Sequence, residues 1–102
     1  MAPSARVGYV AECYWPGVTQ AALADALDRA EAASRELRRN GHDVTLRGAI
    51  LLATDETVFC LFDGRETDIR AAGELAGVPF ERILRTHWFR TPTRADPERG
   101  LR

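Results

Sequence analysis

The sequence predicts an α+β fold in which six elements follow one another as strand, helix, strand, strand, helix, strand. Four segments alternate apolar and polar residues or form short apolar runs, as strands do. Two longer segments repeat apolar residues every three or four positions, as amphipathic helices do. The chain has 102 residues, of which 45% are hydrophobic, so we expect one core and one domain.

The first half of the chain predicts a strand followed by a long helix. Residues 6–14 are strand formers, and Trp15-Pro16-Gly17 ends the extended run. Thr19 has the hydroxyl expected of a helix N-cap, and Asn40-Gly41 supplies a left-handed stop. The apolar stripe of this helix is thin and consists of Leu23, Leu27, Ala30, Ser34 and Leu37.

The middle of the chain predicts a hairpin of two strands. Residues 44–52 alternate, and Thr54-Asp55-Glu56 forms a polar turn. Residues 57–62 are almost continuously apolar, which suits a central strand covered on both faces. In the strand at residues 44–52, alternation predicts that one face carries Val44, Leu46, Gly48, Ile50 and Leu52.

The last third predicts a second helix and a final strand. Residues 66–76 form the helix, which Gly77 and Pro79 end. Its apolar side carries Ile69, Ala72, Gly73 and Ala76. Residues 81–90 form the strand, with Ile83, Arg85, His87 and Phe89 on one face and Leu84, Thr86 and Trp88 on the other.

This order of elements is that of the ferredoxin-like fold, β-α-β-β-α-β. Right-handed crossovers place both helices on one face of a four-stranded antiparallel sheet. The other face is too apolar for water, so we expect a homodimer, an α/β-barrel-like assembly with a cavity between its two sheets. The domain is expected to span residues 1–90, and residues 91–102 form a polar, Pro- and Arg-rich tail that is ordered only if a partner holds it.

Charge and composition argue against several classes of partner. The 14 basic and 15 acidic residues give a net charge of −1, which does not attract nucleic acid. No apolar run approaches the roughly 18–20 residues that cross a membrane, and the first residues lack the features of a signal peptide. We therefore expect a cytoplasmic protein that contacts neither nucleic acid nor membrane. The two cysteines, Cys13 and Cys60, are expected as packed thiols.

Three blocks of sequence resemble a family of small bacterial proteins, common in actinobacteria and catalogued as a domain of unknown function. The blocks are Tyr9–Thr19 (YVAECYWPGVT), Glu56–Phe62 (ETVFCLF) and Ala76–Ile83 (AGVPFERI), and the resemblance covers residues 7–89. It implies a dimeric ferredoxin-like fold. The family is often labelled nickel-binding-protein-like, but it supplies no ligand motif that maps onto this chain.

Glu12 and His87 are the candidate catalytic residues. A carboxylate among apolar and aromatic neighbours can be a general base or a ligand, and a histidine can shuttle a proton or bind metal. The alternative is that Glu12 forms an ion pair with Arg85 across the two neighbouring strands and that His87 is a packing or surface residue.

The candidate ligand-binding residues are Tyr14, Trp15, Arg85 and Trp88, because binding pockets combine aromatic walls with a few polar groups. Trp15 can instead plug the end of the core. The best metal set is Glu12, Cys13, Cys60 and His87, shared across a dimer, although its spacing is unlike any closed structural site.

These residues support three functions. The first is a dimeric binding protein that holds a small ligand, or a divalent ion such as nickel, in a cleft at the open face of the sheet. The second is a cofactor-independent oxygenase, cyclase or isomerase of a natural-product pathway, with Glu12 and His87 as acid and base. The third is a structural adaptor without a cavity.

Overall fold

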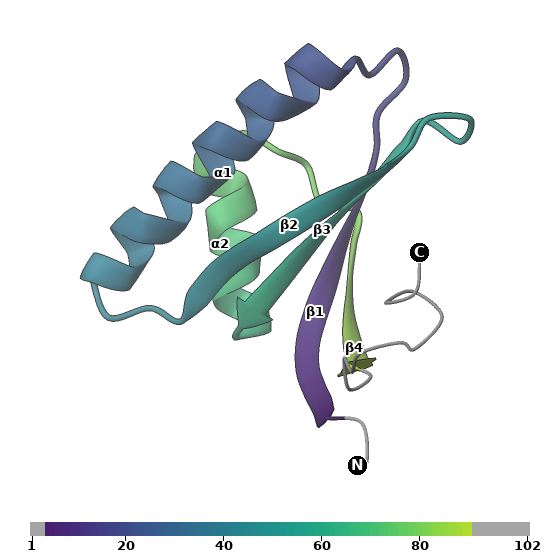
Figure 1. Ribbon diagram of the computed structural model, residues 1–102. Coiled ribbons are helices and arrows are strands. Elements are labelled where there is room, and N and C mark those ends of the chain that lie inside the picture. Colours follow the sequence, from purple (N-terminus) through teal and green to yellow (C-terminus); the bar gives the residue numbers. More distant parts are fainter. Residues whose placement is uncertain (1–3, 91–102) are drawn as a thin grey trace, which may run out of the picture.

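The six elements occur in the predicted order, as Figure 1 shows. The computed structural model describes the backbone of residues 4–90 and the side chains of residues 8–89. The elements are β1 (Ser4–Tyr14), α1 (Gln20–Arg39), β2 (Val44–Leu52), β3 (Thr57–Gly64), α2 (Glu66–Ala76) and β4 (Arg82–Arg90). The tail expected at residues 91–102 lies outside the described residues. Within residues 4–90, neither helix is long and apolar enough to cross a membrane.

The four strands form one antiparallel sheet in the order β2-β3-β1-β4. Both helices lie on the same side of this sheet, with α1 crossing above α2 in Figure 1. The ferredoxin-like α+β fold is therefore confirmed. β3 and β1 occupy the centre, as predicted for β3. The helices bury one face of β3, whereas its other face, which was predicted to be covered as well, is only partly buried at Phe59 and Leu61.

The core lies between the sheet and the helices and is built largely from small side chains. The strands contribute the buried residues Ala11, Cys13, Val44, Val58, Cys60 and Phe62. From α1 come Ala26, Ala30 and Ala33, and from α2 come Ile69, Ala72 and Ala76. Most of these helix residues are alanines, so the buried stripe of α1 is narrow and made of small side chains, as the sequence predicts.

The two helix ends follow local sequence signals. The Thr19 hydroxyl accepts a hydrogen bond from the Ala22 N–H at 3.0 Å, so Thr19 is the N-cap of α1. Gly77 ends α2 in the left-handed conformation, with φ 72°, and the Val78 N–H donates to the Gly73 carbonyl at 2.8 Å. This turn directs the chain from α2 back towards β4.

The predicted alternation of β2 is wrong in its second half. The pairing with β3 shifts between Leu46 and Gly48, so Arg47 is an extra residue in a β-bulge. A bulge exchanges the two faces of the strand beyond it. Ile50 is therefore exposed on the side away from the helices, together with Leu52, whereas Ala49 and Leu51 pack against the core.

The side of the sheet away from the helices, hereafter the open face, carries a row of large apolar side chains. By strand register the open face includes Val10, Ile50, Leu52, Phe59, Leu61, Leu84 and Trp88. Four of these are well exposed: Ile50 at 49%, Leu52 at 42%, Leu84 at 40% and Trp88 at 44%. The sequence-based prediction of an apolar open face is confirmed.

Candidate functional site

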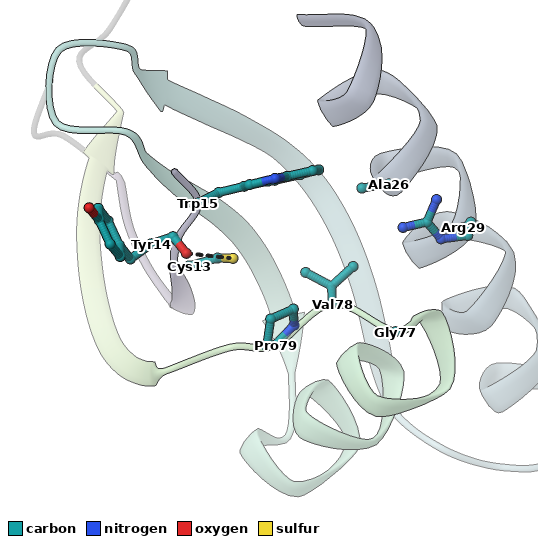
Figure 2. A pocket seen from close by; sticks show the side chains of 8 residues that line it. All are labelled: Cys13, Tyr14, Trp15, Ala26, Arg29, Gly77, Val78 and Pro79. Carbon is teal, nitrogen blue, oxygen red and sulfur yellow. Dashed lines mark hydrogen bonds between the residues drawn. The ribbon is translucent and has the colours of Figure 1, made fainter. Parts of the chain in front are cut away.

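A pocket of about 210 Å³ opens where the end of β1 meets α1 and the loop between α2 and β4 (Figure 2). We call it the Trp15 pocket; its lining residues are Cys13, Tyr14, Trp15, Ala26, Arg29, Gly77, Val78 and Pro79. It lies on the helix side of the sheet. The predicted cleft on the open face would need a second chain to close it.

The hairpin turn between β2 and β3 holds the Trp15 wall of this pocket. The Trp15 N–H donates to the Glu56 carbonyl at 2.7 Å, and the Gly17 N–H donates to the Glu56 carboxylate at 2.7 Å. Glu56 itself has a left-handed backbone, with φ 51°, which is uncommon outside glycine. The loop that carries Trp15 is therefore held at two backbone positions by one residue, Glu56.

The opposite wall, Val78 and Pro79, is fixed by close packing below it. A Cβ atom on Gly73 would come within 2.6 Å of the Phe80 ring, so only glycine lets α2 approach this ring. Phe80 in turn meets Phe62 edge to face, with ring centroids 5.7 Å apart. The wall thus rests directly on the core.

Arg29 supplies the charge of the Trp15 pocket. Its Nε–H donates to the Ala76 carbonyl at 3.1 Å, which bridges α1 to the end of α2. Its Nη1 donates to the Asp25 carboxylate at 2.6 Å. The guanidinium is half-exposed and the Asp25 side chain is more exposed still, so this ion pair is a surface pair of small net energy.

Cys13 lies at the inner side of the pocket as a neutral thiol. Its Sγ is 3.9 Å from the Tyr14 carbonyl, which is a weak hydrogen bond. Burial, and next the nearby charge of Glu81, raises the pKa of Cys13 above its usual value. Deeper in the core, burial raises the pKa of Cys60 to about 12. Both cysteines are free, as predicted.

Glu12 forms an ion pair, but with Arg82 rather than with Arg85. The Arg82 Nε lies 2.6 Å from the Glu12 carboxylate, directly across the β1–β4 ladder. This hydrogen bond holds the pKa of Glu12 below its usual value. Arg85 faces Tyr9 instead, and an offset of three residues along β4 places it on the other face of the sheet.

The structure does not bring Glu12 and His87 together within one chain. His87 is exposed and pairs with Val7 of β1. It lies five residues beyond Arg82, which is about 16 Å along the strand and on the opposite face. An acid–base pair of Glu12 and His87 therefore stays a prediction that requires a second chain.

The four predicted ligand-binding residues are also divided between different places. Tyr14 and Trp15 line the pocket, although Figure 2 shows the Tyr14 ring directed away from it. Arg85 and Trp88 are not among its lining residues. Trp88 lies on the open face with its indole nitrogen near Gly8.

The four predicted metal ligands are separated in the same way. Cys13 and Cys60 are buried on the helix side, Glu12 faces the open side, and His87 lies towards the end of β4. Within the part of the chain that the structure describes, no group of three or more His, Cys, Asp or Glu residues could hold a metal ion. One chain alone does not assemble the predicted set.

Sequence reasoning missed Arg29 and the hydrogen bond between His42 and Asp68. Arg29 was one of many charges on the outer face of a helix, and only the tertiary structure places it beside a pocket. His42, which follows the end of α1, has its Nδ1 2.9 Å from an Asp68 carboxylate oxygen. Asp68 also accepts from the Asp43 N–H at 2.8 Å, and these bonds hold its pKa below the usual value.

The comparisons with known proteins support the fold but assign no function. No family model and no curated protein matches the chain. Among solved structures, the crystal structure of SCO4226 from Streptomyces coelicolor A3(2) is similar, with a TM-score of 0.66 and 19% identity. The match covers 86% of this chain and 99% of that chain. At this identity the likeness shows the fold alone, and the nickel-binding-protein-like family stays a prediction.

Proposed function

We propose that this chain is a homodimeric protein that binds a small molecule in the Trp15 pocket. The observation that supports binding is a pocket formed by a single chain, with one cationic group among mainly apolar walls. This combination is typical of small-molecule sites, where apolar surface gives affinity and a few polar groups give orientation. Backbone hydrogen bonds at Trp15 and the packing of Phe80 hold both walls in place without a ligand.

Binding is better supported than catalysis. The Cys13 thiol is the reactive group nearest the pocket, and its raised pKa keeps it neutral and weakly nucleophilic. Glu12 lies on the other side of the sheet, paired with Arg82. The predicted enzyme and the predicted nickel protein both need side chains from a second subunit to complete a site.

A fragment screen followed by two-dimensional NMR tests the binding function. Small cyclic molecules that bind are expected to shift the backbone amide signals of Cys13, Gly77 and Val78, which line the pocket. Trp15→Ala should weaken these shifts, whereas Trp88→Ala, on the open face, should leave them unchanged. Fragments that shift only signals of the open face, or a library of several hundred without a pocket binder, would overturn the proposal.

The proposed dimer joins two open faces. Among the residues whose side chains the structure describes, Glu12 pairs with Arg82 at 2.6 Å and Arg47 with Asp63 at 3.4 Å on this face, so the apposition of two copies would not require these charges to be buried unpaired. Four strands of 8 to 11 residues give a flat footprint of about 600 Å². Stable interfaces bury about 800 Å² of accessible surface per partner. Protruding side chains make the accessible surface larger than the flat footprint, so the open face can reach this value.

Sedimentation velocity tests the dimer with a matched pair of variants. Leu84 on the open face and Leu75 on α2 are both exposed, at 40% and 55%. Leu84→Glu should give an 11.3 kDa monomer, because two carboxylates would be buried in a symmetric interface. Leu75→Glu should stay dimeric. A wild-type protein that sediments as a monomer at 100 µM would refute this part of the proposal.

A further inference from the structure

We infer that the Trp15 pocket takes a flat carboxylate of one or two rings, with its rings between Trp15 and Val78–Pro79 and its carboxylate on Arg29. This inference rests on the proposed binding function and names the ligand class. Three features carry it: the shape of the walls, the donors that Arg29 has left, and the limited depth of the pocket.

The walls form a slot for a flat ring. Figure 2 shows the Trp15 indole edge-on, so that one of its faces is turned towards Val78 and Pro79 across the pocket. Aromatic rings favour offset stacking on such a face, and aliphatic side chains on the other side complete the contact without polar groups to desolvate. Trp15 and the Val78–Pro79 segment belong to distant parts of the sequence, and each is fixed by its own contacts.

Arg29 is placed to receive the acid group. Figure 2 shows its guanidinium at the α1 side of the slot. The bonds to Ala76 and Asp25 use the Nε–H and one hydrogen of Nη1. The remaining N–H groups of the guanidinium can bind a carboxylate, and its fixed plane favours a two-point contact. Asp25 is the acidic competitor, but its exposed ion pair is weak enough to yield or to be shared.

The limited depth of the pocket favours short, compact acids over ligands that reach into the core. Behind Trp15 and Cys13, the space that continues into the core measures about 10 Å³, roughly enough for one water molecule. The pocket itself, at about 210 Å³, is smaller than the roughly 300–1,000 Å³ of sites for drug-sized ligands. A one- or two-ring acid fits these limits, and the core side of the pocket offers no channel for the chain of a fatty acid.

NMR titration with four probes tests the ligand class. The probes are 1-naphthoate, its neutral amide, the cationic 1-naphthylmethylamine and the linear acid octanoate. Naphthoate is expected to shift the Gly77 and Val78 amide signals and to bind at least tenfold more tightly than the amide, because only the acid forms the charge-assisted contact with Arg29. The amine and octanoate should bind more weakly than the amide.

Two arginine variants separate the role of Arg29 from a general effect of charge. Arg29→Gln should weaken naphthoate at least tenfold and leave the amide unchanged. Arg70→Gln is the matched control, because Arg70 also pairs with an acid four residues earlier in its helix, Glu66, and lines a neighbouring shallow hollow. It should leave both affinities unchanged. Thermal melts of both variants report whether the fold is retained.

The outcomes distinguish this inference from the proposed function. If the amide binds the pocket as tightly as the acid, or if Arg29→Gln and Arg70→Gln weaken naphthoate equally, the ligand class is wrong while binding itself stands. If none of the four probes shifts a pocket signal at millimolar concentration, the ligand class is also wrong. The wider fragment screen then decides separately whether the pocket binds small molecules at all.

Discussion

The two faces of the sheet are similar in hydrophobicity and differ in what covers them. On the helix side Ala11, Val58 and Phe62 are at most 1% exposed. On the open face Leu84 and Trp88, from the neighbouring edge strand, are 40% and 44% exposed. The hydrophobicity of a strand therefore predicts which of its residues favour burial. It does not predict whether a helix of the same chain or a second chain buries them.

The difference also separates two kinds of stability. Contacts on the helix side are intramolecular, so their contribution to the free energy of unfolding does not depend on protein concentration. In the proposed dimer, contacts on the open face contribute fully only when the second chain is bound, so their contribution should depend on protein concentration. The predictions below use this distinction, beginning with the largest expected effect.

Truncating one phenylalanine on each face gives the sharpest contrast. Phe62→Ala should lower the free energy of unfolding by about 3–5 kcal/mol, because it leaves a cavity beneath α2 and Phe80. Phe59→Ala, from the same strand but on the open face, should cost clearly less at low protein concentration and more as the concentration rises. Urea titrations at 2 and 200 µM measure both variants. If Phe59→Ala lowers the free energy of unfolding equally at both concentrations, the proposed difference between the two faces is wrong.

Adding a methyl group at Gly73 of α2 should weaken the packing of this helix on the core. Gly73→Ala places a carbon against the Phe80 ring, and we expect a loss of about 1–3 kcal/mol from overpacking. Phe80→Leu in the same chain should recover part of this loss, because the smaller side chain makes room. Thermal and urea unfolding of the single and double variants test this coupling; strictly additive losses would contradict it.

Thiol labelling compares the two buried cysteines within the helix-side core. Cys13 borders the open pocket, whereas Cys60 lies deeper and its pKa is raised to about 12. At pH 8 the single-cysteine variant Cys60→Ser should react with a disulfide reagent at least about tenfold faster than Cys13→Ser, since the thiolate is the reactive form. Ligand in the pocket should slow only Cys13. Equal rates would show that both thiols react through global unfolding.

Asp68 makes a smaller, pH-dependent contribution to the free energy of unfolding, because its hydrogen bonds join α2 to the start of β2. Its pKa is lowered below the ordinary value of 3.8, first by the Asp43 N–H and then by His42. The ionised form is therefore favoured in the folded state, and the stabilisation is complete above pH 3.8 and lost as the pH falls through the lower folded value. Asp68→Asn should flatten the acid limb of stability against pH. An unchanged acid limb would assign it to other carboxylates.

Local signals made most of the fold predictable. The Thr19 cap, the Gly77 stop and the turn before Thr57 each act within a few residues, so the six elements could be placed along the chain. The β2 bulge at Arg47 could not be predicted, because an extra residue is set by pairing with β3 and leaves no mark in the hydrophobic pattern. It exchanged the expected positions of Ile50 and its neighbours.

The candidate site was predictable only where it coincides with a local feature. Trp15 was predicted because it is an aromatic residue directly after a strand, and it does line the pocket. Arg29 lies on an exposed helix surface, and its role depends on the distance to the end of α2, which sequence does not encode locally. Glu12 pairs with Arg82 rather than with Arg85, because the β1–β4 register places Arg82 opposite Glu12. Arg85 lies three residues further along β4.

The attachment of Trp15 to Glu56 has a consequence for how this protein could diversify. The hairpin tip that holds the indole in place contributes no side chain to the buried core. If the pocket binds small molecules as proposed, changes in that tip should shift the indole and alter the ligand preference at little cost to folding. Under the same proposal, related chains would acquire new ligand preferences through a segment some forty residues away from Trp15 in the sequence.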